Sequence, residues 1–185
     1  MSRRRGAAIH AEEVEVLRGK CVTLRPPRES DVEAAYSWDC DPELAAWNGR
    51  SPISISLSAA RRDYLARWQD PSVKTFIMEA GEPHEPIGMV TLYDFRNAGC
   101  ELGIKIGAED LRGKGYATEA VELLLTYAFA CLGLEVVRGS TLSHNERMRR
   151  VFEKNSFKQV GDGAILSRYD NRRYPELFYQ RRRED

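Results

Sequence analysis

The chain has 185 residues, which at about 150 residues per domain predicts one domain with a core large enough to fold without a disulfide or metal. Lys plus Arg and Asp plus Glu each number 28, and this zero net charge argues against nucleic acid or a membrane surface as a partner. Hydrophobic residues make up 42% and no apolar run reaches the ~18 residues of a membrane-spanning helix, so we expect a globular, soluble protein.

The cysteine and histidine content argues against a metal site. No Cys-x-x-Cys pair occurs among the cysteines, and the histidines are too few and too scattered to complete a zinc site. We therefore expect no metal, reduced thiols and, because no secretory signal precedes the domain, a cytoplasmic location. Residues 1–16, which include the run Arg3–Arg5, are expected to form a flexible tail before a domain over 17–185.

The first half of the chain predicts two helices among several strands. Residues 21–25 alternate as a strand that ends at Pro26-Pro27, and Ser30 with Glu33 forms a capping box for a helix that ends before Asp41-Pro42. Ser58 is expected to cap a second helix that ends at Asp70-Pro71. Three strands are then predicted over 73–79, 87–93 and 100–106.

The second half contains the most regular helix of the chain. Apolar residues recur at helical spacing over 117–132, and Gly133 is a natural stop. A strand over 134–141, a short helix carrying Val151 and Phe152, and a hairpin over 164–169 and 174–180 follow. Short turns make most strands antiparallel, whereas the strand–helix–strand unit over 100–141 requires a parallel crossover, so we predict an α+β fold with a mixed sheet.

A glycine-rich turn separates the third of these strands from the long helix. The stretch Leu111 to Thr118, L-R-G-K-G-Y-A-T, would expose unpaired backbone N–H groups at a helix N-terminus, which attracts a phosphate or pyrophosphate. The plain alternative is a tight turn before a well-capped helix. A P-loop does not fit, because Gly115 stands where the hydroxyl residue after Lys114 is required, and the dinucleotide fingerprint lacks its third glycine, which is Thr118.

The pattern Arg-x-x-Gly-x-Ala, formed by Arg112, Gly115 and Ala117, resembles the acetyl-coenzyme A motif of the GNAT N-acetyltransferase superfamily. The stretch Cys100 to Phe129 resembles that family's central strand, pyrophosphate loop and helix. The final hairpin is similar to the branch with the ribosomal-protein N-terminal and spermidine acetyltransferases. The resemblance covers roughly residues 17 to 181. It implies a mixed sheet with one parallel pair splayed around the cofactor and helices on both faces.

The resemblance also implies a set of cofactor-binding residues and an activity. The activity is transfer of an acetyl group from acetyl-coenzyme A to a primary amine: a protein N-terminus, a polyamine or a small-molecule amine. Asn145 would hydrogen-bond the pantetheine arm. The backbone of Ile104, Lys105 and Ile106 would pair with that arm, and the pyrophosphate would be held by Arg112, Gly113, Lys114, Gly115, Tyr116, Ala117 and Thr118.

The catalytic residues are less clear from the sequence. Family members often carry a tyrosine seven residues after the asparagine, or a serine three residues after it, but this chain has Phe152 and Met148 there. Tyr116, Ser143 or water could protonate the leaving thiolate instead. Glu101 is either the general base for the amine or an edge charge paired with an arginine. A non-catalytic acetyl-coenzyme A-binding regulatory module is the alternative function.

Three aromatic residues near the first helix could contact an acceptor. Tyr36 and Trp38 lie at helical spacing and are expected in the core, whereas Trp47 falls in a predicted loop and is the better candidate for an acceptor pocket. His144 is expected to be solvated. The sequence leaves open whether the protein is a monomer or a homodimer.

Overall fold

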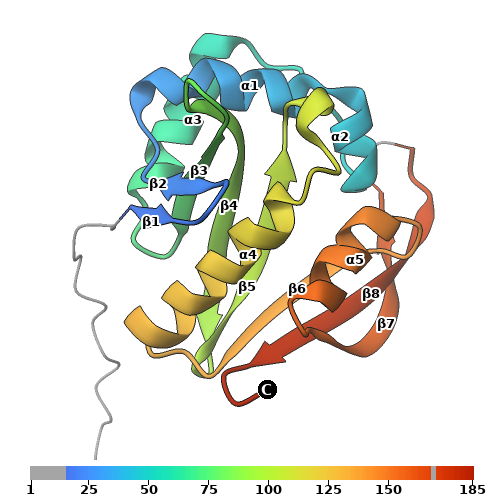
Figure 1. Ribbon diagram of the computed structural model, residues 1–185. Coiled ribbons are helices and arrows are strands. Elements are labelled where there is room, and N and C mark those ends of the chain that lie inside the picture. The colour runs from blue at the N-terminus through green and yellow to red at the C-terminus, as the bar shows by residue number, and fades with distance from the viewer. Residues whose placement is uncertain (1–15, 168–169) are drawn as a thin grey trace, which may run out of the picture.

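The computed structural model describes residues 16–167 and 170–185, which form one eight-stranded sheet in the order β1-β2-β3-β4-β5-β6-β8-β7 (Figure 1). Neighbouring strands are antiparallel except for β5 and β6, which are parallel. This confirms the predicted α+β fold with a mixed sheet. The strands are β1 Leu17–Arg18, β2 Thr23–Arg25, β3 Lys74–Ala80, β4 Glu85–Arg96, β5 Gly99–Ile106, β6 Val136–Leu142, β7 Lys158–Leu166 and β8 Arg173–Arg182.

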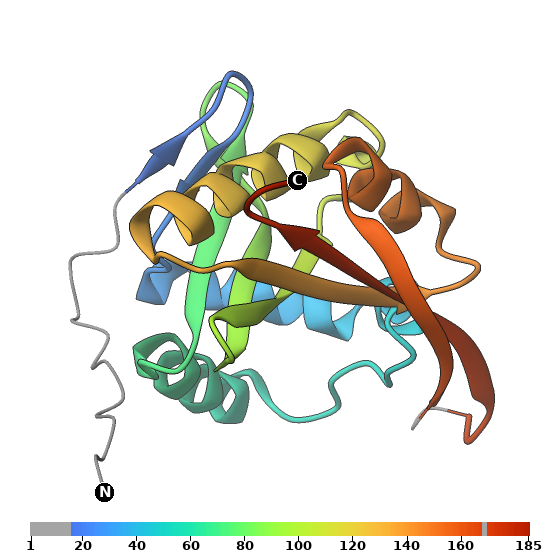
Figure 2. The ribbon, with the colours of Figure 1, turned by 90° about the horizontal axis from the view of Figure 1, so that it is seen from below.

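Helices cover both faces of the sheet (Figure 2). On one face lie α1 (Val32–Cys40), α2 (Pro42–Trp47) and α3 (Leu57–Gln69), and on the other lie α4 (Tyr116–Thr126) and α5 (Glu146–Lys154). α4 continues as a π-helical turn, η3 (Tyr127–Cys131). Two 3-10 turns, η1 (Glu29–Asp31) and η2 (Glu109–Leu111), precede α1 and the glycine loop. No helix in the described ranges is long and apolar enough to cross a membrane.

The main hydrophobic core lies between the sheet and the α4/α5 layer. Cys100 and Leu102 of β5 are buried there with Val121 and Leu124 of α4. A smaller cluster under α1 contains Ala35, Trp38 and Leu44. The alternation predicted for β5 is therefore confirmed: its even-numbered side chains enter the main core and its odd-numbered ones face α1 and α3.

Local capping shifts several predicted boundaries. Ser56, not Ser58, caps α3, because its Oγ accepts from the Ala59 amide at 3.3 Å. Asp31, not Ser30, satisfies the turn before α1 by accepting from the Arg28 amide at 2.6 Å. Asp41 starts a further helix, α2, by accepting from the Glu43 amide at 2.8 Å. Trp47 therefore ends a helix instead of lying in a loop, which corrects the sequence prediction.

Two other expectations concern the ends of the chain. The segment expected to form a flexible tail lies outside the described residues except for Val16. β7 begins at Lys158, well before the predicted start at Ala164. Its residues are mostly exposed and include Gly161 and Gly163, so pairing with β8, not burial, defines the strand.

A buried ion-pair network joins the sheet to the start of α1. Arg25 of β2 donates to both carboxylate oxygens of Asp31, at 2.7 and 2.8 Å, and to Glu79 of β3 at 2.6 Å. Arg25 and Asp31 are only 5% and 2% exposed. Burial raises the pKa of Asp31, but the Arg25 guanidinium and the Arg28 amide outweigh it and hold that pKa below its usual value. The network therefore fixes the start of α1 relative to strands β2 and β3.

Replacing Asp31 with asparagine should lower the free energy of unfolding by about 3 kcal/mol at pH 7, because Arg25 then stays buried without its charge partner. Urea denaturation measures this loss. Since the native pKa is lowered, the difference from wild type is full above about pH 5 and is lost as the pH falls through the native pKa. The control Glu29→Gln removes an exposed partner of Arg61 and should cost less than about 1 kcal/mol. Equal losses in both variants would contradict the assignment.

Candidate functional site

The two parallel strands in the middle of the sheet separate after a short paired stretch. β5 and β6 pair only at Gly99–Val136, Cys100–Val137 and Glu101–Arg138. Beyond Glu101, β5 continues along β4 to Ile106, and β6 continues along β8 to Leu142. The edge of β5 that faces β6 therefore has no strand partner over its last residues (Figure 1).

The backbone groups on that open edge can be assigned from the antiparallel ladder. The Gly107 amide donates to the Ile87 carbonyl on the β4 side at 2.8 Å. Along an antiparallel pair, every second residue directs its N–H and C=O groups to the partner strand, and the residues between them direct theirs to the opposite side. The backbone of Lys105 is therefore turned to β4, whereas the N–H groups of Ile104 and Ile106 point toward β6. Of the three residues expected to line the edge, Ile104 and Ile106 do so and Lys105 faces the other way.

Phe152 lies beside the point where the strands separate. Its side chain is fully buried, stacked on Tyr179 with ring centroids 4.7 Å apart, and it contacts Phe157 at 4.9 Å. A Cβ on Gly139 of β6 would lie 2.7 Å from the Phe152 ring and 3.7 Å from the Leu102 carbonyl. The ring therefore packs directly on the β6 backbone, and Phe152 is a core residue as predicted.

The glycine loop presents backbone amides at the end of β5. Gly113 and Gly115 have φ of +81° and +92°, and a Cβ on either would meet nothing within 4 Å. Within the described chain, the amides of residues 113 to 117 donate to no backbone carbonyl, and α4 begins without a side-chain cap. Intrahelical bonding starts only at Thr118, which donates to Gly115 at 2.9 Å. The loop thus combines free donors, open space and the positive end of a helix dipole.

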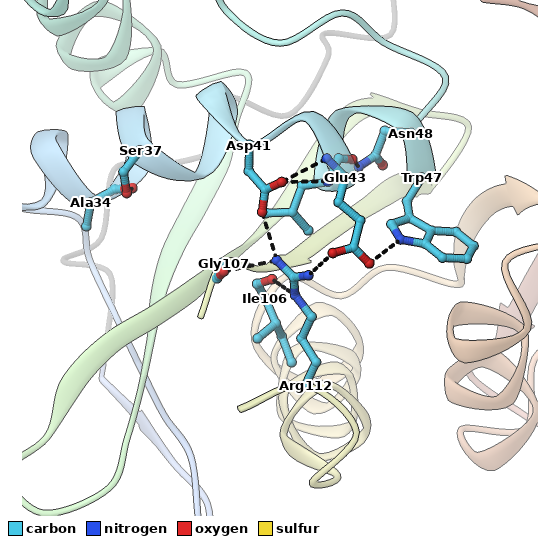
Figure 3. A network of polar contacts seen from close by, with 10 residues as sticks. Ala34, Ser37, Asp41, Glu43, Trp47, Asn48, Ile106, Gly107 and Arg112 are labelled. Carbon is cyan, nitrogen blue, oxygen red and sulfur yellow. Dashed lines mark hydrogen bonds and ion pairs between the residues drawn. The ribbon is translucent and has the colours of Figure 1, made fainter. Parts of the chain in front are cut away.

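The side chain of Arg112 points toward Asp41 and Glu43 (Figure 3). Its guanidinium donates to the carbonyls of Ile106 and Gly107, each at 3.1 Å, and pairs with Asp41 and Glu43 of the α1–α2 region, each at 3.1 Å. The Arg112 side chain is only 9% exposed. The Arg112 amide is also occupied, since it donates to the Glu109 carbonyl at 3.1 Å. An anion in the loop would therefore meet the free amides after Arg112, and Lys114 is the exposed cation there.

Asn145 is placed at the start of α5, where β6 has ended. Its Oδ1 accepts from the Met148 amide at 3.1 Å, which fixes the orientation of the side-chain amide. That bond uses the oxygen and leaves Nδ2 as a donor, with no protein acceptor in the described ranges. The neighbouring His144 is exposed, as predicted, and its ring lies 5.6 Å from that of Trp47.

Glu101 is a half-buried carboxylate at the last paired position of β5. Burial raises its pKa, and the positive charges of Arg138 and Arg96 oppose that rise. Within the described chain, the nearest cationic atom, of Arg96, is 3.9 Å from the Glu101 carboxylate, and no hydrogen bond occupies that carboxylate. A carboxylate with a raised pKa and no tight partner is suited to accept a proton.

Sequence reasoning missed the acidic residues that hold Arg112. Asp41-Pro42 was interpreted only as the end of a helix, although Asp before Pro is also typical of a helix start with Asp as N-cap and Pro at the first helical position. That pattern could have revealed α2 and the carboxylate of Glu43 in its first turn. The pairing of both acids with Arg112 has no signal in the sequence.

In this fold, the two parallel strands at the middle of the sheet separate, and the glycine loop that follows β5 has amides without a backbone acceptor among the described residues. This is the architecture of an N-acetyltransferase. The model of the acetyltransferase (GNAT) domain matches residues 22–158. The chain belongs to the GNAT acetyltransferase family and is an N-acetyltransferase, which confirms the resemblance found in the sequence.

Relatives and solved structures agree with this family. The chain is 29% identical to human alpha/beta-tubulin-N-acetyltransferase 9 over 166 residues, which cover 82% of this chain and 79% of the relative. A GNAT-family acetyltransferase from Bacillus anthracis superposes with a TM-score of 0.80 at 18% identity, over 92% of this chain and all of that one. Spermidine N-acetyltransferase from Vibrio cholerae, solved in complex with CoA and spermine, gives 0.80 at 19%, over 88% and 96% of the two chains. These two structures support the fold.

Phe152→Leu should lower stability by about 1 kcal/mol and leave kcat per folded molecule nearly unchanged, because the ring has no proton to donate. Phe152→Tyr should place a hydroxyl near Gly139 and Leu102, with a similar or higher rate. Thermal melts and steady-state rates measure both effects. Phe157→Leu, from the other side of the same aromatic stack, is the control. A collapse of kcat in Phe152→Leu alone, without unfolding, would show that Phe152 acts at the reacting centre.

Proposed function

We propose that the protein transfers an acetyl group from acetyl-coenzyme A to a primary amine. One observation carries the proposal: the unpartnered edge of β5 leads directly into a loop whose amides are free and whose glycines leave room for a ligand. An extended arm with amide groups fits the edge as an added strand, and a pyrophosphate fits the loop. The residues present therefore suit coenzyme A.

Each part of the site has a binding role in this proposal. The backbone of Ile104 and Ile106 would bond the pantetheine arm, and Asn145 would donate to it from Nδ2. The free amides of residues 113 to 117 would hold the pyrophosphate, with the Thr118 hydroxyl as a further donor and Lys114 adding a positive charge. Acetyl-coenzyme A supplies the acetyl group as a thioester. By holding both reactants at the separated strands, the protein supplies catalysis mainly through approximation.

Glu101 is the proposed general base. An α-amine has a pKa of roughly 7.7–8.0 and a lysine amine ~10.4, so the acceptor must lose a proton before it attacks. The Glu101 side chain faces the α1/α3 side of the sheet, opposite to the core side chains of β5. The acceptor would therefore approach from that side. With Phe152 in the core, water, Tyr116 or Ser143 would protonate the thiolate, whose pKa near ~8.5 requires only modest help.

Acetyl transfer is tested by release of free thiol from acetyl-coenzyme A across a panel of peptides with free N-termini, polyamines and aminoglycosides. Release with at least one class supports the proposal. Binding of coenzyme A with no release for any amine would favour the non-catalytic alternative. A cytoplasmic location and the choice between monomer and homodimer stay predictions.

Gly115→Glu should weaken coenzyme A binding at least a hundredfold, because the side chain fills the proposed pyrophosphate space and adds a repelling charge. Calorimetry with coenzyme A measures the affinity. Gly133→Glu is a matched control after the far end of the same helical segment: its φ is +65°, and a Cβ there also meets nothing within 4 Å. The control should keep wild-type affinity. Equal affinity in both folded variants would exclude this loop as the cradle.

Glu101→Gln should reduce turnover by roughly 10²-fold near neutral pH, because a general base is lost. The loss should shrink as the pH approaches the pKa of the amine, which then deprotonates without help. In the wild type, activity should fall as acid protonates Glu101, at a pH above that of an ordinary carboxylate because its pKa is raised. The exposed Glu122→Gln on α4, which is not among the charges that shift the Glu101 pKa, serves as control. An unchanged pH–rate profile in Glu101→Gln would remove Glu101 from the mechanism.

A further inference from the structure

We propose that the side chain of Arg112 is a positioning residue for the acceptor, although its backbone belongs to the cofactor loop. The side chain joins the α1–α2 region to the end of β5. The same loop would then bind the cofactor through its amides and position the acceptor side through Arg112. This inference rests on the proposed function. We call Arg112, Asp41 and Glu43 the latch.

The latch connects three parts of the chain through a nearly buried guanidinium. Nε and one terminal nitrogen of Arg112 donate to the carbonyls of Ile106 and Gly107, where β5 ends. The two terminal nitrogens also reach Asp41 and Glu43, both at 3.1 Å (Figure 3). Each of the three guanidinium nitrogens therefore donates inside the protein, and this side chain is held in place before any ligand binds.

Two further contacts hold the same region on β5. Lys105 forms a partly buried ion pair with Asp39 near the end of α1. A Cβ on Gly107 would lie 2.0 Å from the Trp38 ring, so this ring rests directly on the strand's final backbone. The stretch from Trp38 to Glu43 is thus attached to β5 and its loop at three successive points.

The latch also extends across the separated strands. Glu43 accepts from Trp47 Nε1 at 3.2 Å with the carboxylate oxygen that Arg112 does not use. The Trp47 ring lies 5.6 Å from His144, and His144 lies 6.0 Å from Tyr174 of β8. α2 therefore spans from the β5 side to the β6 and β8 side, and it ends against the residue that precedes Asn145.

This placement puts the latch on the side from which the amine must come. Lys105 and Glu101 share one face of β5, and α1 packs on that face above Lys105. The α1–α2 region therefore lies on the same face of β5 from which an amine would reach Glu101 in the proposed function. The position of α2 should consequently affect how an acceptor binds, while the free amides of the loop set how coenzyme A binds.

Loss of the Arg112 side chain should loosen α2 without unfolding it. Asp41 keeps its bonds to the amides of Glu43 and Leu44, so the helix keeps its cap. What is lost is the connection to β5, and two carboxylates and two carbonyls lose their shared donor.

The test compares Arg112→Met with Lys114→Met, its exposed neighbour in the same loop. Calorimetry with coenzyme A gives the cofactor Kd, and steady-state rates with the best amine of the panel give the acceptor KM. Arg112→Met should raise the acceptor KM about tenfold and change the cofactor Kd less than about threefold. Lys114→Met should show the reverse pattern, with a raised cofactor Kd that depends on salt.

A second pair of variants covers the case that Arg112→Met does not fold. Glu43→Gln, on the surface of α2, should raise the acceptor KM severalfold, and Glu43→Asp should recover part of the loss. In the double variant Arg112→Met with Glu43→Gln, the two effects should not multiply, because both break one connection. An acceptor KM unchanged in the Glu43→Gln variant, or an Arg112→Met variant that loses cofactor affinity alone, would overturn the inference. Failure of the wild type to bind coenzyme A would instead overturn the proposed function.

Discussion

The site depends on the limited pairing between β5 and β6. β6 follows β8 as far as Leu142, and β5 follows β4 as far as Ile106, so the two strands part after Glu101 and Arg138. Phe152 packs on the Gly139 backbone of β6 at the point of separation. An edge of β5 is left with unused amides inside the sheet, where backbone donors are normally paired. The glycine loop, α2 and Glu101 are all arranged around this edge.

Ion pairs hold the α1–α2 region against the end of β5. The chain is neutral, but an acidic stretch with Asp39, Asp41 and Glu43 meets the cations Lys105 and Arg112 at the end of β5. Burial lowers the pKa of Lys105, and the charge of Asp39 opposes that change. Lys105 and Arg112 are thus both held in ion pairs within the protein. In the proposed function, anion binding would therefore rely on the free amides of the loop, the helix dipole and the exposed Lys114.

The aromatic core replaces a proton donor that many family members carry. Phe152 stacks on Tyr179 and contacts the tilted ring of Phe157, and its own ring lies against the β6 backbone with no room for a Cβ on Gly139. The position therefore contributes packing and strand separation instead of acid catalysis. In the proposed function, approximation and the base Glu101 would serve without an acid at position 152, because a thiolate is already a fair leaving group at neutral pH.

The sequence by itself determined the strand–turn–helix order, the faces of β5, the glycine loop and the burial of Phe152, because these features depend on near neighbours: alternation, helical spacing and turn residues. It also indicated the family. Only the tertiary structure decided three contacts. The Arg112 side chain bonds to Glu43 of α2, the backbone of Lys105 faces β4, and the Trp47 ring contacts His144. Arg112 and Glu43 are 69 positions apart, and partners at that distance are chosen by how the elements pack, which periodicity and composition do not encode.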